Sequence, residues 1–321
     1  MINCFIKKIA NSLRWRIERI FVTICKFFNT FYYRYNKNNI LVVNASFFQF
    51  FSHVRTFNLG DDLNYHLIKA LSGKKVVAYN QFYHGVQTNY MCIGSVIDWL
   101  ADEKTIVWGS GILNLRTESE NNKVNCLSKD SIRAVRGRKT RQILQDAGKD
   151  CPEIYGDPAL LLPLVYHPSI SIIEGRIGII PHYKDLNNPN IRRLLESNER
   201  AILIDVKHYK DWHNVIDSIV SCEFIISSSL HGLILADAYG VPNQWIIVGN
   251  GLPGGAFKFE DYYSSVCKNG IPFKITNTTT MKELETMKQT YQSIDFNPLP
   301  LLRACPFLIQ NQNILDLLAK S

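Results

Sequence analysis

The residues best suited to chemistry lie in one short run, Ser227–Gly232, in which three serines are followed by leucine, histidine and glycine. The run comes directly after the apolar stretch Phe224–Ile226 and opens an apolar helical pattern, so it is predicted to join a buried strand to a helix. Hydroxyls and N–H groups at a helix start can hold a phosphate, and a histidine there can exchange a proton near neutral pH. We expect Ser228 and Ser229 to bind an anion and His231 to be catalytic; the alternative is a purely structural histidine.

A second run is rich in cations. Four basic residues fall within seven positions, from Arg133 to Lys139, where the predicted strand Ile132–Val135 passes into a helix. The planar fork of arginine matches carboxylate and phosphate groups. We therefore expect Arg136 and Arg138 to bind an anion, the alternative being a solvated run of charge.

Two adjacent carboxylates, Asp61 and Asp62, lie at a predicted loop-to-helix turn within Asn58–Asn64. Helix capping is one explanation, and it stabilises a helix by about 1 kcal/mol. Because two carboxylates exceed what capping needs, we expect them to be catalytic and to accept a proton. Asn64 is expected to bind substrate beside them.

Further polar residues follow other predicted strands. His182 and Lys184 come just after Ile177–Ile180, and Lys258 follows the last long apolar run. These three are expected to contact an anionic substrate.

Small residues after a strand permit a ligand to approach the backbone closely, and Gly109 and Ser110 are therefore expected to line the substrate site. The turn at Gly156–Ala159 has either a structural or a functional role. The chain contains no GxSxG elbow, Walker loop or GxGxxG fingerprint, which disfavours hydrolase, phosphoryl-transfer and nicotinamide chemistry.

Short apolar strands that alternate with amphipathic helices predict parallel sheets covered on both faces. The expected strands are Ile40–Val43, Lys75–Ala78, Met91–Ile93, Thr105–Trp108, Ile132–Val135, Ile177–Ile180, Ala201–Val206, Phe224–Ile226 and Trp245–Val248. The expected helices are Asp61–Leu71, Lys139–Ala147, Trp212–Val220 and Leu230–Tyr239. Ligands bind at the carboxyl ends of such strands, where the polar residues above lie. We divide the chain into a terminal segment, 1–38, and two Rossmann-like domains, 39–165 and 166–321, the second ending in a helical tail.

Composition places the chain among globular proteins, with 321 residues, 46% apolar and 20% charged. The net charge is +8, but residues 1–38 hold eight bases against one acid, so the rest is nearly neutral. A basic nucleic-acid-binding body is therefore excluded. The eight cysteines include no pair at zinc-ligand spacing, so reduced thiols and no metal site are expected.

The terminal segment reads as a basic amphipathic helix. Its apolar residues recur every three or four positions: Ile6, Ile9, Leu13, Ile17, Ile20, Ile24, Phe27 and Phe31. The longest uncharged run is far short of the roughly 20 residues that a spanning helix needs. We expect the helix to lie on an anionic membrane surface, the alternative being a helix packed on the body or on a partner chain.

Taken in order, these motifs resemble those of the polysaccharide pyruvyltransferase family, over roughly residues 40–265. They are Gly60–Asn64, Trp108–Gly111, Arg136-Gly137 with Thr140, Gly156–Ala159, and Ser229–Gly232 through Ala238–Pro242. The resemblance implies a GT-B-like α/β fold, in which two Rossmann-like domains with parallel sheets face a cleft. It also implies transfer of a pyruvate ketal from phosphoenolpyruvate to a sugar of a capsule or exopolysaccharide, or to its lipid-linked precursor, without a metal or cofactor.

The resemblance also implies roles for single residues. His231 matches the family's acid near phosphoenolpyruvate, and Arg136 matches a basic residue that binds this donor. Many members have arginine two positions before the histidine, where this chain has Ser229, so Arg138, His182 or Lys258 is expected to replace that contact.

A lipid-carried acceptor would place the enzyme in the cytoplasm, at the inner face of the cytoplasmic membrane. Two alternatives stay open: a GT-B glycosyltransferase with a nucleotide-sugar donor, and a non-catalytic glycan-binding protein of an assembly complex.

Overall fold

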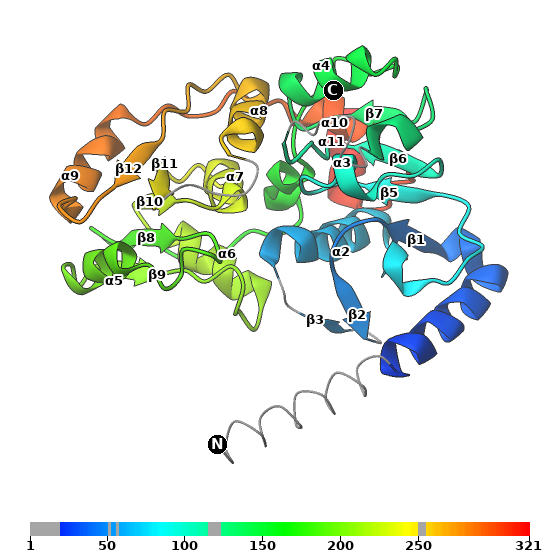
Figure 1. Ribbon diagram of the computed structural model, residues 1–321, viewed down its shortest axis with the longest axis horizontal. Helices are drawn as coiled ribbons and strands as arrows, with labels where there is room; N and C mark the ends of the chain where they lie inside the picture. Colours follow the sequence, from blue (N-terminus) through cyan, green and yellow to red (C-terminus); the bar gives the residue numbers. More distant parts are fainter. Residues whose placement is uncertain (1–19, 51–52, 56–57, 115–122, 250–254) are drawn as a thin grey trace.

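Two parallel sheets with helices on both faces form the body of the protein (Figure 1). The computed structural model describes residues 20–50, 53–55, 58–114, 123–249 and 255–321. Each sheet has five strands, and helices lie between and around the sheets. This architecture confirms the predicted α/β fold with its GT-B-like pair of sheets.

The first sheet has the strand order β4-β1-β5-β6-β7. Its strands are β1 (Ile40–Val43), β4 (Lys75–Ala78), β5 (Asn89–Met91), β6 (Thr105–Trp108) and β7 (Ile132–Ala134). The helices of this half are α2 (Leu59–Ser72), α3 (Ile97–Leu100) and α4 (Arg138–Asp146), and the 3-10 helix η4 (Pro158–Leu164) follows. A short antiparallel hairpin, β2 (Phe48–Phe50) and β3 (His53–Arg55), lies between β1 and α2.

The second sheet has the order β12-β11-β10-β8-β9. Its strands are β8 (Ile177–Ile180), β9 (Ala201–Leu203), β10 (Phe224–Ser227), β11 (Asn243–Val248) and β12 (Phe273–Ile275). Its helices are α5 (Pro189–Glu196), α6 (Trp212–Val220), α7 (Leu230–Ala238), α8 (Phe257–Ser265) and α9 (Met281–Thr286).

Both sheets use the same strand order when each is counted along the chain: second, first, third, fourth, fifth. In such a sheet the order reverses between the first and third strands, and ligands bind outside the carboxyl ends of the strands at that point. The reversal falls between β1 and β5 in one half and between β8 and β10 in the other. Residues that follow these strands are therefore placed to form a site.

The strands that the sequence predicts are confirmed with small shifts at their ends. All residues of β1, β8 and β10 are buried, because these parallel strands are covered by helices on both faces. Helix α2 ends at Gly73, whose φ of 67° is a left-handed C-cap that favours glycine. The hairpin and β12 were not predicted; both consist of three-residue strands, too short for a periodic signal.

The final segment of the chain returns to the first half. Helices α10 (Pro298–Arg303) and α11 (Gln312–Ala319) follow the second half in sequence, yet the Trp108 indole donates a hydrogen bond to the Leu301 carbonyl at 2.9 Å. The backbone N–H of Gln310 donates to the Leu71 carbonyl at 2.7 Å. The predicted helical tail thus packs on the first sheet.

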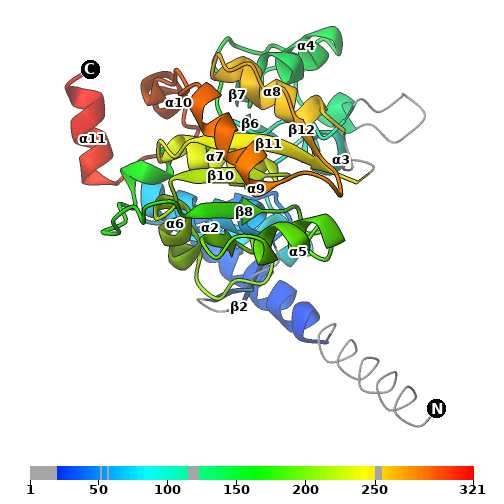
Figure 2. The ribbon, with the colours of Figure 1, turned by 90° about the vertical axis from the view of Figure 1, so that its left-hand side faces the viewer.

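A helix over residues 20–36 precedes the first sheet and projects from its edge (Figure 2). Residues 1–19, which hold the start of the predicted amphipathic helix, lie outside the described residues. Among the described helices, none is long and apolar enough to cross a bilayer.

Candidate active site

The imidazole of His231 lies where the two halves meet. His231 is in the first turn of α7, and its ring packs against Gly60 in the first turn of α2, so that a β-carbon at Gly60 would overlap the ring. Only glycine leaves this space, which gives the Gly60 of the motif a physical role. Burial, together with the positive charges of Arg136 and Lys258, lowers the pKa of His231 to about 3. The ring is therefore neutral before an anion binds.

Asp157 is the nearest carboxylate to this ring. Its Oδ2 lies 3.9 Å from His231 Nε2, and neither atom, both buried, has a hydrogen-bond partner among the described residues. Its Oδ1 accepts the Ala159 N–H at 3.0 Å, which makes Asp157 the N-cap of η4. Burial raises the pKa of Asp157 to about 7. The two groups can thus share a proton near neutral pH through an atom placed between them.

The sequence leaves the role of the Gly156–Ala159 turn open and does not single out Asp157. The position of Asp157 in the chain could have identified it as a site residue. It follows Tyr155, which forms an isolated bridge to Val135 at the edge of the first sheet. An acid after such a bridge lies at the ligand-binding edge. Gly109, with a φ of 87°, allows this turn to approach, since a side chain there would overlap Pro158.

The two carboxylates of α2 have different surroundings. The pKa of Asp61 rises to about 7 through burial, while the hydrogen bond from Asn58 opposes the rise and the charge of Asp62 adds to it. Asp62 accepts the Tyr209 hydroxyl at 2.5 Å and the Asn58 N–H at 3.3 Å. Asp62 therefore ties α2 to the second half, and Asp61 is the better candidate for a base.

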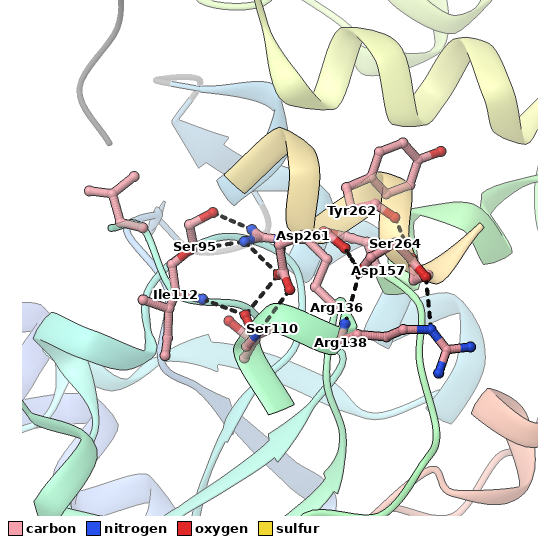
Figure 3. A network of polar contacts seen from close by, with 12 residues as sticks. Ser95, Ser110, Ile112, Arg136, Arg138, Asp157, Asp261, Tyr262 and Ser264 are labelled. Carbon is pink, nitrogen blue, oxygen red and sulfur yellow. Dashed lines mark hydrogen bonds and ion pairs between the residues drawn. The ribbon is translucent and has the colours of Figure 1, made fainter. Parts of the chain in front are cut away.

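Arg136 forms an ion pair between the halves. Its Nε donates a hydrogen bond to Asp261 Oδ2 at 3.0 Å, its Nη2 lies 2.9 Å from the same oxygen, and both side chains are fully buried. The guanidinium also donates to Ser95 Oγ and, at 2.9 Å, to the Ile112 carbonyl (Figure 3). A side chain at Gly111 would overlap the guanidinium. We predicted a direct contact between Arg136 and a substrate anion. In the structure the Arg136 guanidinium is instead paired with the Asp261 carboxylate.

Asp261 is held from the α4 side as well. The backbone N–H and the hydroxyl of Thr140, in the first turn of α4, each donate to its carboxylate at 2.7 Å. The backbone of Asp261 passes so close to Gly137 that no other residue fits there. The pair thus closes the contact between α4 and α8.

Arg138 also serves the contact between the halves. Its Nε donates to the Ser264 carbonyl at 3.2 Å, and its guanidinium lies 4.7 Å from the centre of the Tyr155 ring. The side chain is exposed and points away from Arg136 (Figure 3). Its predicted role as a donor ligand is thus not supported by its position.

The second half contains cationic side chains that could still bind an anion. Lys258 is 7% exposed, and no described carboxylate forms an ion pair with it. Burial and the charges of Arg136 and Lys184 lower its pKa to about 8. Burial and the charges of Lys258, Lys184 and Lys207 lower the pKa of His182 to about 4. We call Lys258, Lys184, Lys207 and the His182 ring the cation cluster. Its three lysines create a positive potential that an anion would relieve.

The serine run is mostly bonded within the protein. Ser228 Oγ donates to Asp185 at 2.7 Å and accepts the His182 N–H at 2.9 Å, so it positions His182 rather than a ligand. Ser229 is the N-cap of α7, with no hydrogen bond from its side chain to the helix. Of the two serines expected to bind substrate, Ser229 is the better placed.

Two further predicted ligands have structural contacts. Both polar atoms of the Asn64 side chain bond to the backbone of Ile93, at 3.0 and 2.9 Å, which fixes α2 to the end of β5. Ser110 Oγ donates to the Gly94 carbonyl at 3.0 Å. These residues shape the site from beneath. Among the described residues no three His, Cys, Asp or Glu side chains gather as a metal site would require.

Much of the chain is similar to known proteins. The family described as polysaccharide pyruvyl transferase matches residues 14–248. An uncharacterized protein of Acanthamoeba polyphaga mimivirus is 28% identical over 276 residues, covering 84% of this chain and 88% of that protein. A crystal structure of an uncharacterized protein from Klebsiella pneumoniae is 15% identical, with a TM-score of 0.46, and covers 77% of this chain and 96% of that one.

Removing the carboxylate charge of the buried pair is expected to weaken the whole fold. Asp261→Asn leaves the Arg136 cation buried and unpaired, which should lower the free energy of unfolding by about 3–5 kcal/mol in urea denaturation. Glu260→Gln is the matched control, because Glu260 pairs with Lys139 at 2.5 Å while both are partly exposed; its loss should be about 0–1 kcal/mol. Equal losses in the two variants would contradict a special role for the buried pair.

Proposed function

Because the chain belongs to the polysaccharide pyruvyl transferase family, we propose that it transfers pyruvate from phosphoenolpyruvate to two hydroxyls of one sugar, as a ketal. The acceptor is a surface polysaccharide or its lipid-linked precursor. One observation carries the proposal: the cation cluster, whose Lys258 is buried without a carboxylate partner among the described residues, adjoins the His231 and Asp157 pair.

The donor fits this place by charge. Phosphoenolpyruvate carries a phosphate and a carboxylate on three carbons, so its binding requires several positive groups within a small volume. Lys258 and Lys184 supply positive charge, the neutral His182 ring can donate or accept a hydrogen bond, and the N–H groups at the start of α7 add a favourable dipole. An anion there reverses the local field and raises the pKa of His231 from its low value.

We assign the protonation step to His231 Nε2 and Asp157 Oδ2, the two buried atoms without a hydrogen-bond partner among the described residues. His231, protonated when the donor binds, delivers a proton to the methylene carbon of phosphoenolpyruvate, and Asp157 supplies the replacement proton. The central carbon becomes electrophilic, and one sugar hydroxyl attacks it. Asp61, with its raised pKa, accepts the proton of that hydroxyl.

The second step closes the ketal. The bond from the central carbon to the phosphate oxygen breaks, and a second hydroxyl of the sugar takes its place. Of the two hydroxyl protons released overall, one balances the proton added to the methylene carbon and the other leaves on phosphate. The products are inorganic phosphate and the pyruvylated sugar, and no oxidant or reductant is consumed.

We propose that the reaction takes place in the cytoplasm, at the inner face of the cytoplasmic membrane. A nucleotide-sugar donor is the competing class for this fold. The cation cluster favours the smaller donor, because its positive groups lie near one buried lysine.

The proposal is tested by phosphate release. Purified protein should release inorganic phosphate from phosphoenolpyruvate only when a suitable lipid-linked oligosaccharide is added, and the sugar should gain the mass of a pyruvate ketal. His231→Ala should lose at least about 100-fold in turnover, the usual contribution of a positioned acid. Wild-type turnover in this variant would remove His231 from the mechanism, and glycan binding with no turnover in the wild type would indicate a non-catalytic member.

Lys258 is expected to hold the donor. Lys258→Met should weaken phosphoenolpyruvate binding in calorimetry by about tenfold or more, because hydrogen bonds to charged groups contribute about 1.5–3 kcal/mol. Lys274→Met, at an exposed position of β12, is the control and should bind as wild type. Tight binding of a uridine diphosphate sugar, with none of phosphoenolpyruvate, would favour the glycosyltransferase instead.

The pH profile should fall on both sides of neutrality. The base Asp61 is lost as pH drops below about 7, and the acid Asp157 is lost as pH rises above about 7, since burial raises both pKa values. Asp157→Asn keeps the cap of η4 but cannot supply a proton, so turnover should fall and the alkaline limb of kcat/KM should change. An unchanged alkaline limb in this variant would assign that limb to another group.

A further inference from the structure

The helix over residues 20–36 turns its apolar side toward solvent. Its exposed large side chains are Ile20 (62% exposed), Ile24 (47%), Phe27 (64%), Phe28 (63%), Phe31 (56%), Tyr32 (45%) and Tyr35 (69%). At 3.6 residues per turn these positions form one side of the helix, which we call the aromatic stripe. A helix that serves only the fold would bury such a stripe against the body.

The opposite side fixes the helix in this orientation. Tyr33 is 8% exposed, and its ring lies 5.5 Å from that of Phe82. The Thr30 hydroxyl accepts the Tyr83 N–H at 3.1 Å. The helix therefore packs on the first half through its other side and holds the aromatic stripe outward, so the packed-helix alternative does not account for the stripe. Both views show the helix projecting clear of α7 and α8 (Figures 1 and 2).

Exposed apolar patches of this kind mark surfaces that bind a partner or a membrane. The charges near the aromatic stripe favour a membrane over a protein partner. Residues 20–39 contain no acid, and Arg34 and Lys37 are both exposed. The Lys75 ammonium, from β4, lies 4.7 Å from the Tyr32 ring centre. Aromatic rings rimmed by cations match the interface of a bilayer whose headgroups are anionic.

We propose that the aromatic stripe docks the protein on an anionic phospholipid surface, with the helix lying in the plane of the interface. Among the described residues no helix is long and apolar enough to cross a bilayer. The docking depends on residues of the helix and of β4, so it is independent of the donor and of the reaction.

The test is co-sedimentation of the full chain with vesicles of phosphatidylcholine and phosphatidylglycerol in equal parts. Phe27→Asp with Phe31→Asp should reduce the bound fraction by about tenfold or more, because both apolar area and attraction to lipid charge are lost. Ile271→Asp with Leu308→Asp is the matched control, since these side chains are 80% and 66% exposed but lie elsewhere. The control should bind like wild type.

Three results would overturn the proposal: no binding of the wild type to these vesicles, equal loss in both double variants, or a wild-type dimer in ultracentrifugation that Phe27→Asp with Phe31→Asp dissociates. The last would assign the stripe to contact between copies of the chain. Vesicles of phosphatidylcholine alone should bind less protein, and equal binding would reject the charge component. Donor-dependent phosphate release with a water-soluble acceptor should be unchanged in the stripe variant, so failure of the docking and failure of the reaction are separable.

Discussion

A buried guanidinium and a buried carboxylate, from opposite halves of the molecule, fix the geometry on which the site depends. Arg136 and Asp261 are both removed from water, and such a pair is favourable only when its remaining hydrogen-bonding atoms are satisfied. Ser95, Ile112 and Thr140 meet that condition. With α4 and α8 held together, the ring of His231 is brought against α2 of the other half.

The site between the halves is electrostatically unfavourable before a ligand binds. Burial raises the pKa of Asp61 and Asp157, and burial together with neighbouring cations lowers the pKa of His231, His182 and Lys258. These pKa shifts favour the uncharged form of each group. Keeping any of these groups charged therefore costs free energy. A small anion bound beside Lys258 would relieve the cost on Lys258, His182 and His231, so that anion binding and protonation of His231 would favour each other.

Much of the fold could be predicted because parallel strands, buried on both faces, leave continuous apolar runs in the sequence. The location of the site was predicted for the same reason, since polar residues after strands meet at one edge. The roles of single residues were harder. Asp261 lies 125 positions from Arg136, so nothing local reveals that this cation already has a partner. Asp157 was not predicted as a site residue, because a Gly-Asp-Pro run is typical of a turn and needs no functional role. The sequence predicted an apolar stripe from Ile6 to Phe31, but its direction in the described part of the helix is determined by the packing of Tyr33.

The return of the C-terminal segment to the first sheet bears on how the protein is made. The indole of Trp108 donates its hydrogen bond to the carbonyl of Leu301, 193 positions later in the chain. The carbonyl of Leu71 accepts a hydrogen bond from the backbone N–H of Gln310. The second half is in effect an insertion between two pieces of the first. On the ribosome the strands of the N-terminal sheet therefore emerge early, but the C-terminal segment that packs on this half emerges much later. A chain shortened by its last helices would leave part of the core of the first half uncovered.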